Sequence, residues 1–178
     1  MCATDEREML LRVTAIQREL QKVEELAQTL ARLQARRKDS DCGKAARYLL
    51  KFYAVCERIL ILIEGKVEGR LVRHVDWRSR LLLEAEISLP GVRSPILTAS
   101  HCKLLQKLLA FRNLQRNIYG YVPAPYVIEK LSALVIAQQP QLAAEIQQFL
   151  AFLKQHAHAG KKRLAKKTRS ISYLKESS

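Results

Sequence analysis

A short polar segment, FRNLQRNIYGYV at residues 111–122, carries the side chains whose types and spacing could bind a phosphate group. In a helix, which turns by about 100° per residue, its polar side chains fall on one contiguous face. Arginine suits such a site because its planar guanidinium donates several hydrogen bonds and keeps its charge. The pattern therefore predicts a phosphate-facing helix surface. Its residues are Arg112, Asn113, Arg116, Asn117 and Tyr119.

A purely structural interpretation of the same residues is also open. Two arginines one turn apart repel each other, and carboxylates of neighbouring helices could pair with them. The candidate carboxylates are Glu64, Glu84 and Glu86. A tyrosine near a helix end, such as Tyr119, is often a core residue with its hydroxyl at the surface.

The helix that must position this segment begins in the leucine-rich stretch before it. Thr98 or Ser100 can cap its first turn, and the GYVPAP sequence at 120–125 ends it. One stripe of this helix is mostly apolar, so the polar face adjoins a buried seam. The stripe consists of Leu104, Leu108, Phe111, Gln115 and Ile118.

The rest of the chain also has helical periodicity, with no strongly alternating segment. Apolar residues recur at steps of three or four, and Gly65, Pro125 and Pro140 mark expected helix ends or starts. We predict an all-α, antiparallel bundle of four to six helices in one domain, residues 1–156, followed by a basic tail, residues 157–178. The further helices are expected at about 5–36, 44–64, 77–87, 125–137 and 140–156.

Charge and cysteine usage narrow the class of protein. The 178 residues carry a formal net charge of +14, which favours nucleic acid or acidic partners, although a basic surface can serve solubility alone. We expect a cytoplasmic protein without a membrane segment or signal peptide. The cysteines lack CxxC spacing, and His156 with His158 makes a weak metal motif, so no metal, cofactor or disulfide is expected. The cysteines are Cys2, Cys42, Cys56 and Cys102.

The frame from Arg112 to Tyr119 resembles the signature of HepT-like ribonuclease toxins, which belong to the HEPN superfamily. That signature is an arginine, a polar residue, three further residues, a histidine, one residue and a tyrosine. Here Asn117 takes the place of the histidine, and Asn113 stands where one branch often has another histidine. The resemblance covers about Tyr48 to Leu134.

The resemblance implies a HEPN-like bundle that forms a homodimer, with the two motifs lining an RNA cleft. Active members are metal-independent endoribonucleases, in which the histidine assists attack by the ribose 2′-hydroxyl and the arginine stabilises the developing charge. Their usual partner is a small nucleotidyltransferase antitoxin that transfers AMP to the motif tyrosine. By this correspondence the catalytic positions are Arg112 and Asn117, the RNA phosphate is bound by Arg112, Asn113 and Arg116, and Tyr119 is the candidate AMP acceptor.

The asparagine at position 117 changes the expected chemistry. An amide does not exchange a proton near neutral pH, and general acid–base catalysis is worth about 10² to 10⁴ in rate. The chain is therefore predicted to bind RNA but to cleave it slowly or not at all, unless His74, or His101 of a second subunit, takes over. Two alternatives remain: a non-catalytic helical dimer acting as a protein-interaction or nucleic-acid-binding adaptor, and a protein whose tail is its main nucleic-acid element.

Overall fold

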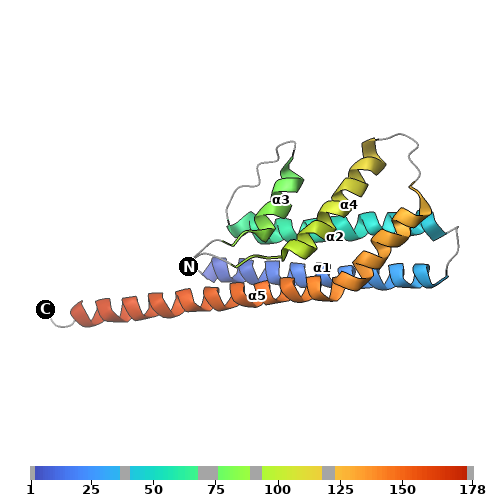
Figure 1. Ribbon diagram of the computed structural model, residues 1–178. Coiled ribbons are helices and arrows are strands. Elements are labelled where there is room, and N and C mark those ends of the chain that lie inside the picture. The colour runs from blue at the N-terminus through green and yellow to red at the C-terminus, as the bar shows by residue number, and fades with distance from the viewer. Residues whose placement is uncertain (1–2, 37–40, 68–75, 89–93, 118–122, 176–178) are drawn as a thin grey trace.

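The structure is a computed structural model, and its described residues form five helices and no strand. It describes residues 3–36, 41–67, 76–88, 94–117 and 123–175, with side chains described within 7–36, 41–64, 76–88, 94–117 and 123–155. The predicted all-α bundle is confirmed (Figure 1). The helices are α1 (Ala3–Arg36), α2 (Cys42–Val67), α3 (Trp77–Glu86), α4 (Ala99–Asn117) and α5 (Pro125–Lys175).

The two N-terminal helices form an antiparallel pair. The three-and-four spacing of apolar residues in α1 faces α2 and α5, which both run in the opposite direction to α1 (Figure 1). Val23 and Leu30 of α1 and Phe52 of α2 are completely buried at this contact layer. The predicted end of α2 at Gly65 is wrong, because α2 continues to Val67. A glycine inside a helix costs only about 1 kcal/mol relative to alanine, which neighbouring turns can offset.

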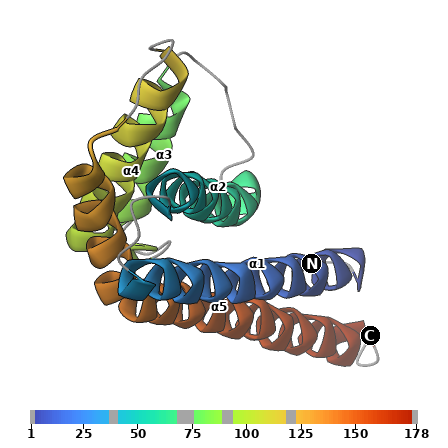
Figure 2. The ribbon, with the colours of Figure 1, turned by 90° about the vertical axis from the view of Figure 1, so that its right-hand side faces the viewer.

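The helices α3 and α4 pack on one side of α2, whereas α1 and most of α5 lie on its other side (Figure 2). The extended chain before α4 is tied to the end of α3, since the backbone N–H groups of Ile96 and Leu97 both donate to the Ala85 carbonyl, at 2.8 and 3.1 Å. The thiol of Cys102 also donates to the Leu82 carbonyl at 3.5 Å. These bonds fix the start of α4 against α3 and thereby set its direction.

The C-terminal part of the chain corrects the prediction of two helices meeting at Pro140. One helix, α5, runs from Pro125 to Lys175 with Pro140 inside it. Proline removes one backbone hydrogen bond and pushes against the preceding turn, so it bends a helix when packing supports both sides. Figures 1 and 2 show α5 changing direction after its first turns. Buried Val135 and Leu142 flank the proline and anchor both arms in the core.

The helix α5 also passes through the segment that the sequence assigned to a basic tail. The division into residues 1–156 and 157–178 stays a prediction. Within the described part of the chain, no helix is long and apolar enough to cross a membrane.

Candidate functional site

The C-terminal end of α4 carries the polar segment singled out by the sequence. The predicted apolar stripe is buried at Leu104, Leu108 and Phe111. Arg112 follows Leu108 by four positions and therefore continues this buried face at the helix end, where it is half-buried. The other described polar residues of the segment are exposed: Asn113, Arg116 and Asn117.

Four of the five predicted site residues thus lie together on the last two turns of α4. The fifth, Tyr119, lies outside the described residues, as does Ile118 of the stripe. Of the two residues expected to cap the helix, Thr98 and Ser100, Thr98 directly precedes it, and the Thr98 carbonyl accepts a 3.0 Å hydrogen bond from the Cys102 N–H. The apolar face of α4 is therefore buried up to Phe111, and the polar side chains of Asn113, Arg116 and Asn117 beyond it are exposed.

The two motif arginines have no anionic partner in the described part of the chain. No ion pair joins Arg112 or Arg116 to Glu64, Glu84 or Glu86 there, and Glu84 lies 3.8 Å from Arg80 on its own helix. The buried amide nitrogen of Gln115 likewise lacks a hydrogen-bond partner. Unpaired charges and donors on one helix end suit an external anion, because a buried donor without a partner is costly.

Arg112 lies above a hydrogen-bonded group that joins α2 to α3. The Glu57 carboxylate oxygen Oε1 accepts from the Tyr53 hydroxyl at 2.9 Å and from Arg78 Nε at 2.7 Å. Burial, together with the nearby Glu57 carboxylate, raises the pKa of Tyr53, whereas the positive charges of Arg78 and Arg112 act in the opposite direction. The phenol therefore stays protonated and remains a donor to Glu57.

Sequence reasoning missed Glu57 and Arg78. They lie 21 positions apart on different helices, so no periodicity pairs them. The only available signal was Tyr53 with Glu57, an i,i+4 pair of hydrogen-bonding groups within a predicted helix. That signal indicates a polar spot on the core face of α2 but not its partner.

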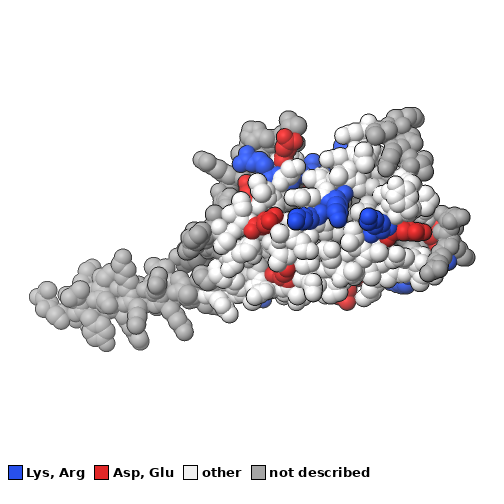
Figure 3. All heavy atoms as spheres, viewed as in Figure 1, with Lys and Arg blue, Asp and Glu red and all other residues white. Residues whose placement is uncertain are grey.

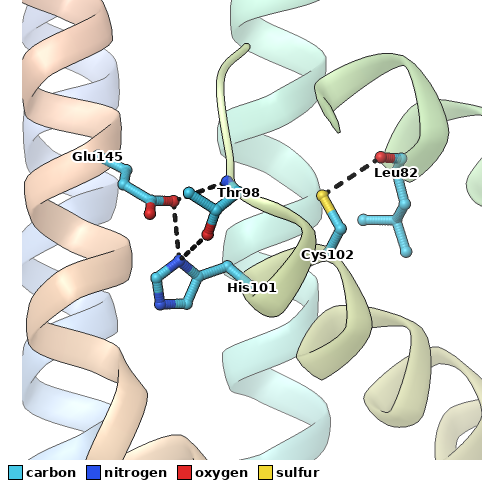
Figure 4. Close-up of polar contacts among 5 residues, drawn as sticks. All are labelled: Leu82, Thr98, His101, Cys102 and Glu145. Atoms are coloured by element: carbon cyan, nitrogen blue, oxygen red, sulfur yellow. Dashed lines mark hydrogen bonds and ion pairs between the residues drawn. The ribbon is translucent and has the colours of Figure 1, made fainter. Parts of the chain in front are cut away.

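The N-terminal end of α4 holds a different polar group (Figure 4). The Glu145 oxygen Oε2, from α5, accepts the Thr98 backbone N–H at 3.0 Å and lies 2.8 Å from His101 Nδ1. The Thr98 hydroxyl lies 3.1 Å from the same ring nitrogen. A carboxylate at a helix N-terminus satisfies a backbone donor and interacts favourably with the helix dipole. We call Thr98, His101 and Glu145 the α4 clamp.

The α4 clamp excludes His101 as a substitute for the missing motif histidine. The residue is 3% exposed, and its ring is held by Glu145 of the same chain. It lies eleven residues before Arg112, about 16 Å along the helix. The ring is therefore too far from the motif of its own chain to act there. Because it is buried, it is also inaccessible to the motif of a second subunit. His74 lies outside the described residues.

The surface around the site carries side chains of both charges (Figure 3). Lys and Arg side chains spread across α3 and α4 on the face in Figure 3, with acidic side chains among them. The described residues include no group of three or more His, Cys, Asp or Glu side chains that could hold a metal ion. A cavity of about 650 Å³ lies among α1, α2 and α5, and no described residue of α4 lines it. No disulfide involves the described cysteines, which are Cys42, Cys56 and Cys102.

Fold and site together define an all-α bundle whose fourth helix ends in two arginines without an ion-pair partner among the described residues. A model of the HepT-like protein family matches residues 44–153, more than half of the chain. The chain therefore belongs to the HepT-like family of the HEPN superfamily, and the match includes the whole segment from Tyr48 to Leu134 that carries the resemblance. No match was found among curated proteins or solved structures. Family membership indicates the fold of a toxin-type ribonuclease and a toxin–antitoxin context.

Proposed function

We propose that this protein binds RNA through the C-terminal end of α4 and is a weak or degenerate metal-independent endoribonuclease. The observation that carries the proposal is the pair of motif arginines without an ion-pair partner among the described residues. Arg112 and Arg116 bind the phosphate, and Asn113 and Asn117 donate amide hydrogen bonds that orient it. An arginine–phosphate contact is a charge-assisted bond, about twice as strong as a neutral one.

Cleavage is expected to be slow because the described residues bring no suitable proton-transfer group to the motif. Asn117 occupies the position of the family's histidine, and His101 is sequestered in the α4 clamp. The Tyr53 hydroxyl is buried, has a raised pKa and donates to Glu57, so it is a poor base. Charge stabilisation by Arg112 remains, which supports binding of a phosphate more than its cleavage.

The family context supports two partners. A homodimer would bring two α4 ends together, and the exposed apolar side chain of Leu114 lies among the motif residues of α4. A small nucleotidyltransferase antitoxin would neutralise the protein by transferring AMP to Tyr119. Size-exclusion chromatography with light scattering tests the dimer, and mass spectrometry after co-expression with a neighbouring nucleotidyltransferase gene tests the modification.

The decisive experiment compares RNA binding with RNA cleavage in EDTA. Fluorescence anisotropy with a labelled single-stranded RNA should show binding by the wild-type protein and a clear loss in Arg112→Ala. Gel analysis of the same RNA should show little or no cleavage by the wild type and metal-independent cleavage by Asn117→His. A gain of about 10² or more is expected, since that is the usual contribution of general acid–base catalysis.

The control Asn117→Gln keeps an amide at the position and should not cleave. If Asn117→His gains no cleavage and neither Arg112→Ala nor Arg116→Ala weakens RNA binding, the site assignment is wrong. A wild-type protein that binds no RNA would favour the adaptor function, in which the helical dimer binds protein partners only.

A further inference from the structure

Arg78, at the start of α3, is held in place more firmly than an ordinary surface arginine. Its Nε donates to Glu57 at 2.7 Å, and its guanidinium carbon lies 4.3 Å from the centre of the Trp77 ring. The side chain is 28% exposed, whereas that of Glu57 is 13% exposed. Arg78 has therefore lost most of its conformational freedom before any ligand arrives, which lowers the entropic cost of binding.

The terminal nitrogens of Arg78 are left available by this arrangement. Only Nε contacts Glu57, and no hydrogen bond joins Nη1 or Nη2 to another described residue. These two nitrogens form the end of the guanidinium fork that matches two oxygens of a phosphate. An arginine that served only to stabilise the fold would form two parallel hydrogen bonds with the carboxylate. Here Arg78 bonds only one oxygen of Glu57.

The charges around Glu57 do not balance. One carboxylate faces Arg78, and the charges of both Arg78 and Arg112 act on the neighbouring Tyr53 hydroxyl. Arg116, one turn beyond Arg112, adds another positive charge without a described partner. Two guanidinium groups, those of Arg78 and Arg112, beside one carboxylate leave an excess of positive charge, which an anion would neutralise.

The fold places Arg78 and the motif on the same side of α2. In Figures 1 and 2, α3 begins and α4 ends on the side of α2 that faces away from α1. Glu57 of α2 binds both Tyr53 and Arg78, and the charge of Arg112 also acts on Tyr53. A polyanion bound to Arg112 and Arg116 could continue across this surface to Arg78. Free phosphate would span only one of these positions, whereas a nucleic-acid backbone presents phosphates in succession.

We propose that Arg78 is a further RNA-binding residue, which contacts a backbone phosphate next to the one held by Arg112, and that Glu57 and Trp77 are its positioning residues. This inference rests on the proposed RNA-binding function. It extends the site from one helix end to a surface formed by α2, α3 and α4. The sequence frame from Arg112 to Tyr119 does not include any of these three residues.

The test is the salt dependence of RNA affinity for Arg78→Ala and a matched control. Arg80→Ala removes the same charge from the same helix, at a side chain that is 66% exposed and paired with Glu84. Each phosphate contact to single-stranded RNA contributes about 0.7 to the slope of log K against log salt. Arg78→Ala should lower the slope by about that amount and weaken binding by about tenfold. Arg80→Ala should bind within about twofold of the wild type.

The variant Arg78→Lys separates charge from geometry. Lysine keeps the charge but cannot bond Glu57 and a phosphate with one rigid fork. It should retain the wild-type salt slope while binding a few-fold more weakly. Urea unfolding of each variant shows whether any loss reflects unfolding instead.

The possible results distinguish the role of Arg78 from the proposed RNA-binding function. If Arg112→Ala loses RNA binding while a folded Arg78→Ala behaves like Arg80→Ala, Arg78 is a structural residue and the inference is wrong. If Arg78→Ala unfolds, Arg78→Lys and Arg78→Gln decide instead. The inference is also wrong if both of these variants keep the wild-type RNA affinity and the wild-type salt dependence. If the wild type binds no RNA, the proposed function fails first.

Discussion

The two ends of α4 carry polar residues in opposite circumstances. At the start, Thr98 and His101 are held by Glu145 in a closed set of contacts. At the end, Arg112 and Arg116 extend the helix with no ion-pair partner among the described residues. Both groups lie beside the same buried leucines of α4.

The difference separates polar groups that hold the fold from polar groups available to a ligand. Buried polar groups are tolerated when each has a partner, so the α4 clamp is explained by the chain itself. The charges at the other end have no such explanation within the described structure. Residue type alone does not show this, because the sequence marks Arg112 as a motif residue and also offers His101 as a possible substitute for the motif histidine.

Removing Glu145 should have the largest effect and should act on stability alone. Glu145→Ala leaves the Thr98 N–H and the His101 ring without their shared acceptor, which we expect to lower the free energy of unfolding by about 2 to 3 kcal/mol. Urea unfolding measures the loss. Glu129→Ala, at an exposed carboxylate on the same helix, should stay within about 0.5 kcal/mol of the wild type. Unchanged stability in Glu145→Ala would show that the clamp does not hold α4.

The thiol of Cys102 reports on the same end of the helix. Burial, followed by the nearby charges of Glu86 and Glu145, raises its pKa to about 12, so almost no thiolate exists at pH 8. We expect slow alkylation by iodoacetamide in the wild type and faster alkylation in Glu145→Ala, because the start of α4 opens more often. Burial also raises the pKa of Cys56 in α2, whose labelling rate serves as the internal reference. Equal acceleration at both thiols would mean global rather than local opening.

Arg112→Ala should have the next largest effect and should act on RNA binding. Loss of a charge-assisted phosphate contact is expected to weaken binding by about 2 kcal/mol, or about 30-fold, while stability changes by less than about 1 kcal/mol. Anisotropy titrations and urea unfolding of the same preparations measure both quantities. If Arg112→Ala loses stability but keeps its RNA affinity, Arg112 stabilises the fold as the α4 clamp does, and the contrast between the two ends of α4 is wrong.

Arg116→Ala should weaken RNA binding by about 1 kcal/mol, since its exposed side chain is ordered only by the ligand. The matched control is Lys107→Ala, which removes the same charge from an exposed position on the outward face of α4. That variant should change affinity by less than about 0.5 kcal/mol. Equal losses in the two variants would mean that RNA responds to the net charge of +14 and not to the motif.

The helices and the end of α4 were predictable from sequence because they depend on local rules. Periodicity placed α1 and α4, and hydroxyl residues before an apolar run limited the start of α4 to Thr98 or Ser100, of which the structure has Thr98 directly before the helix. The continuation of α5 through Pro140 was not predictable, because it depends on which helices pack against the parts of α5 before and after the proline. The pairs of His101 with Glu145 and of Arg78 with Glu57 join residues 44 and 21 positions apart. Such pairs follow from how helices cross, and no local pattern encodes that.

Asn113→Ala should have the smallest effect and gives the finest test of the contrast between the two ends. Asn113 is exposed beside the arginines, and its amide can offer a phosphate one neutral hydrogen bond, worth about 0.5 to 1.5 kcal/mol when fully formed. Because an exposed amide is hydrated before binding, we expect a loss near the lower limit, about twofold in affinity, with no change in salt slope since no charge is removed. Anisotropy titrations of Asn113→Ala and Arg116→Ala at several salt concentrations compare the RNA affinity and the salt dependence of the two variants. A loss as large as that of Arg112→Ala would mean that Asn113 contributes more than orientation, and a salt-dependent loss would mean that the substitution displaces an arginine.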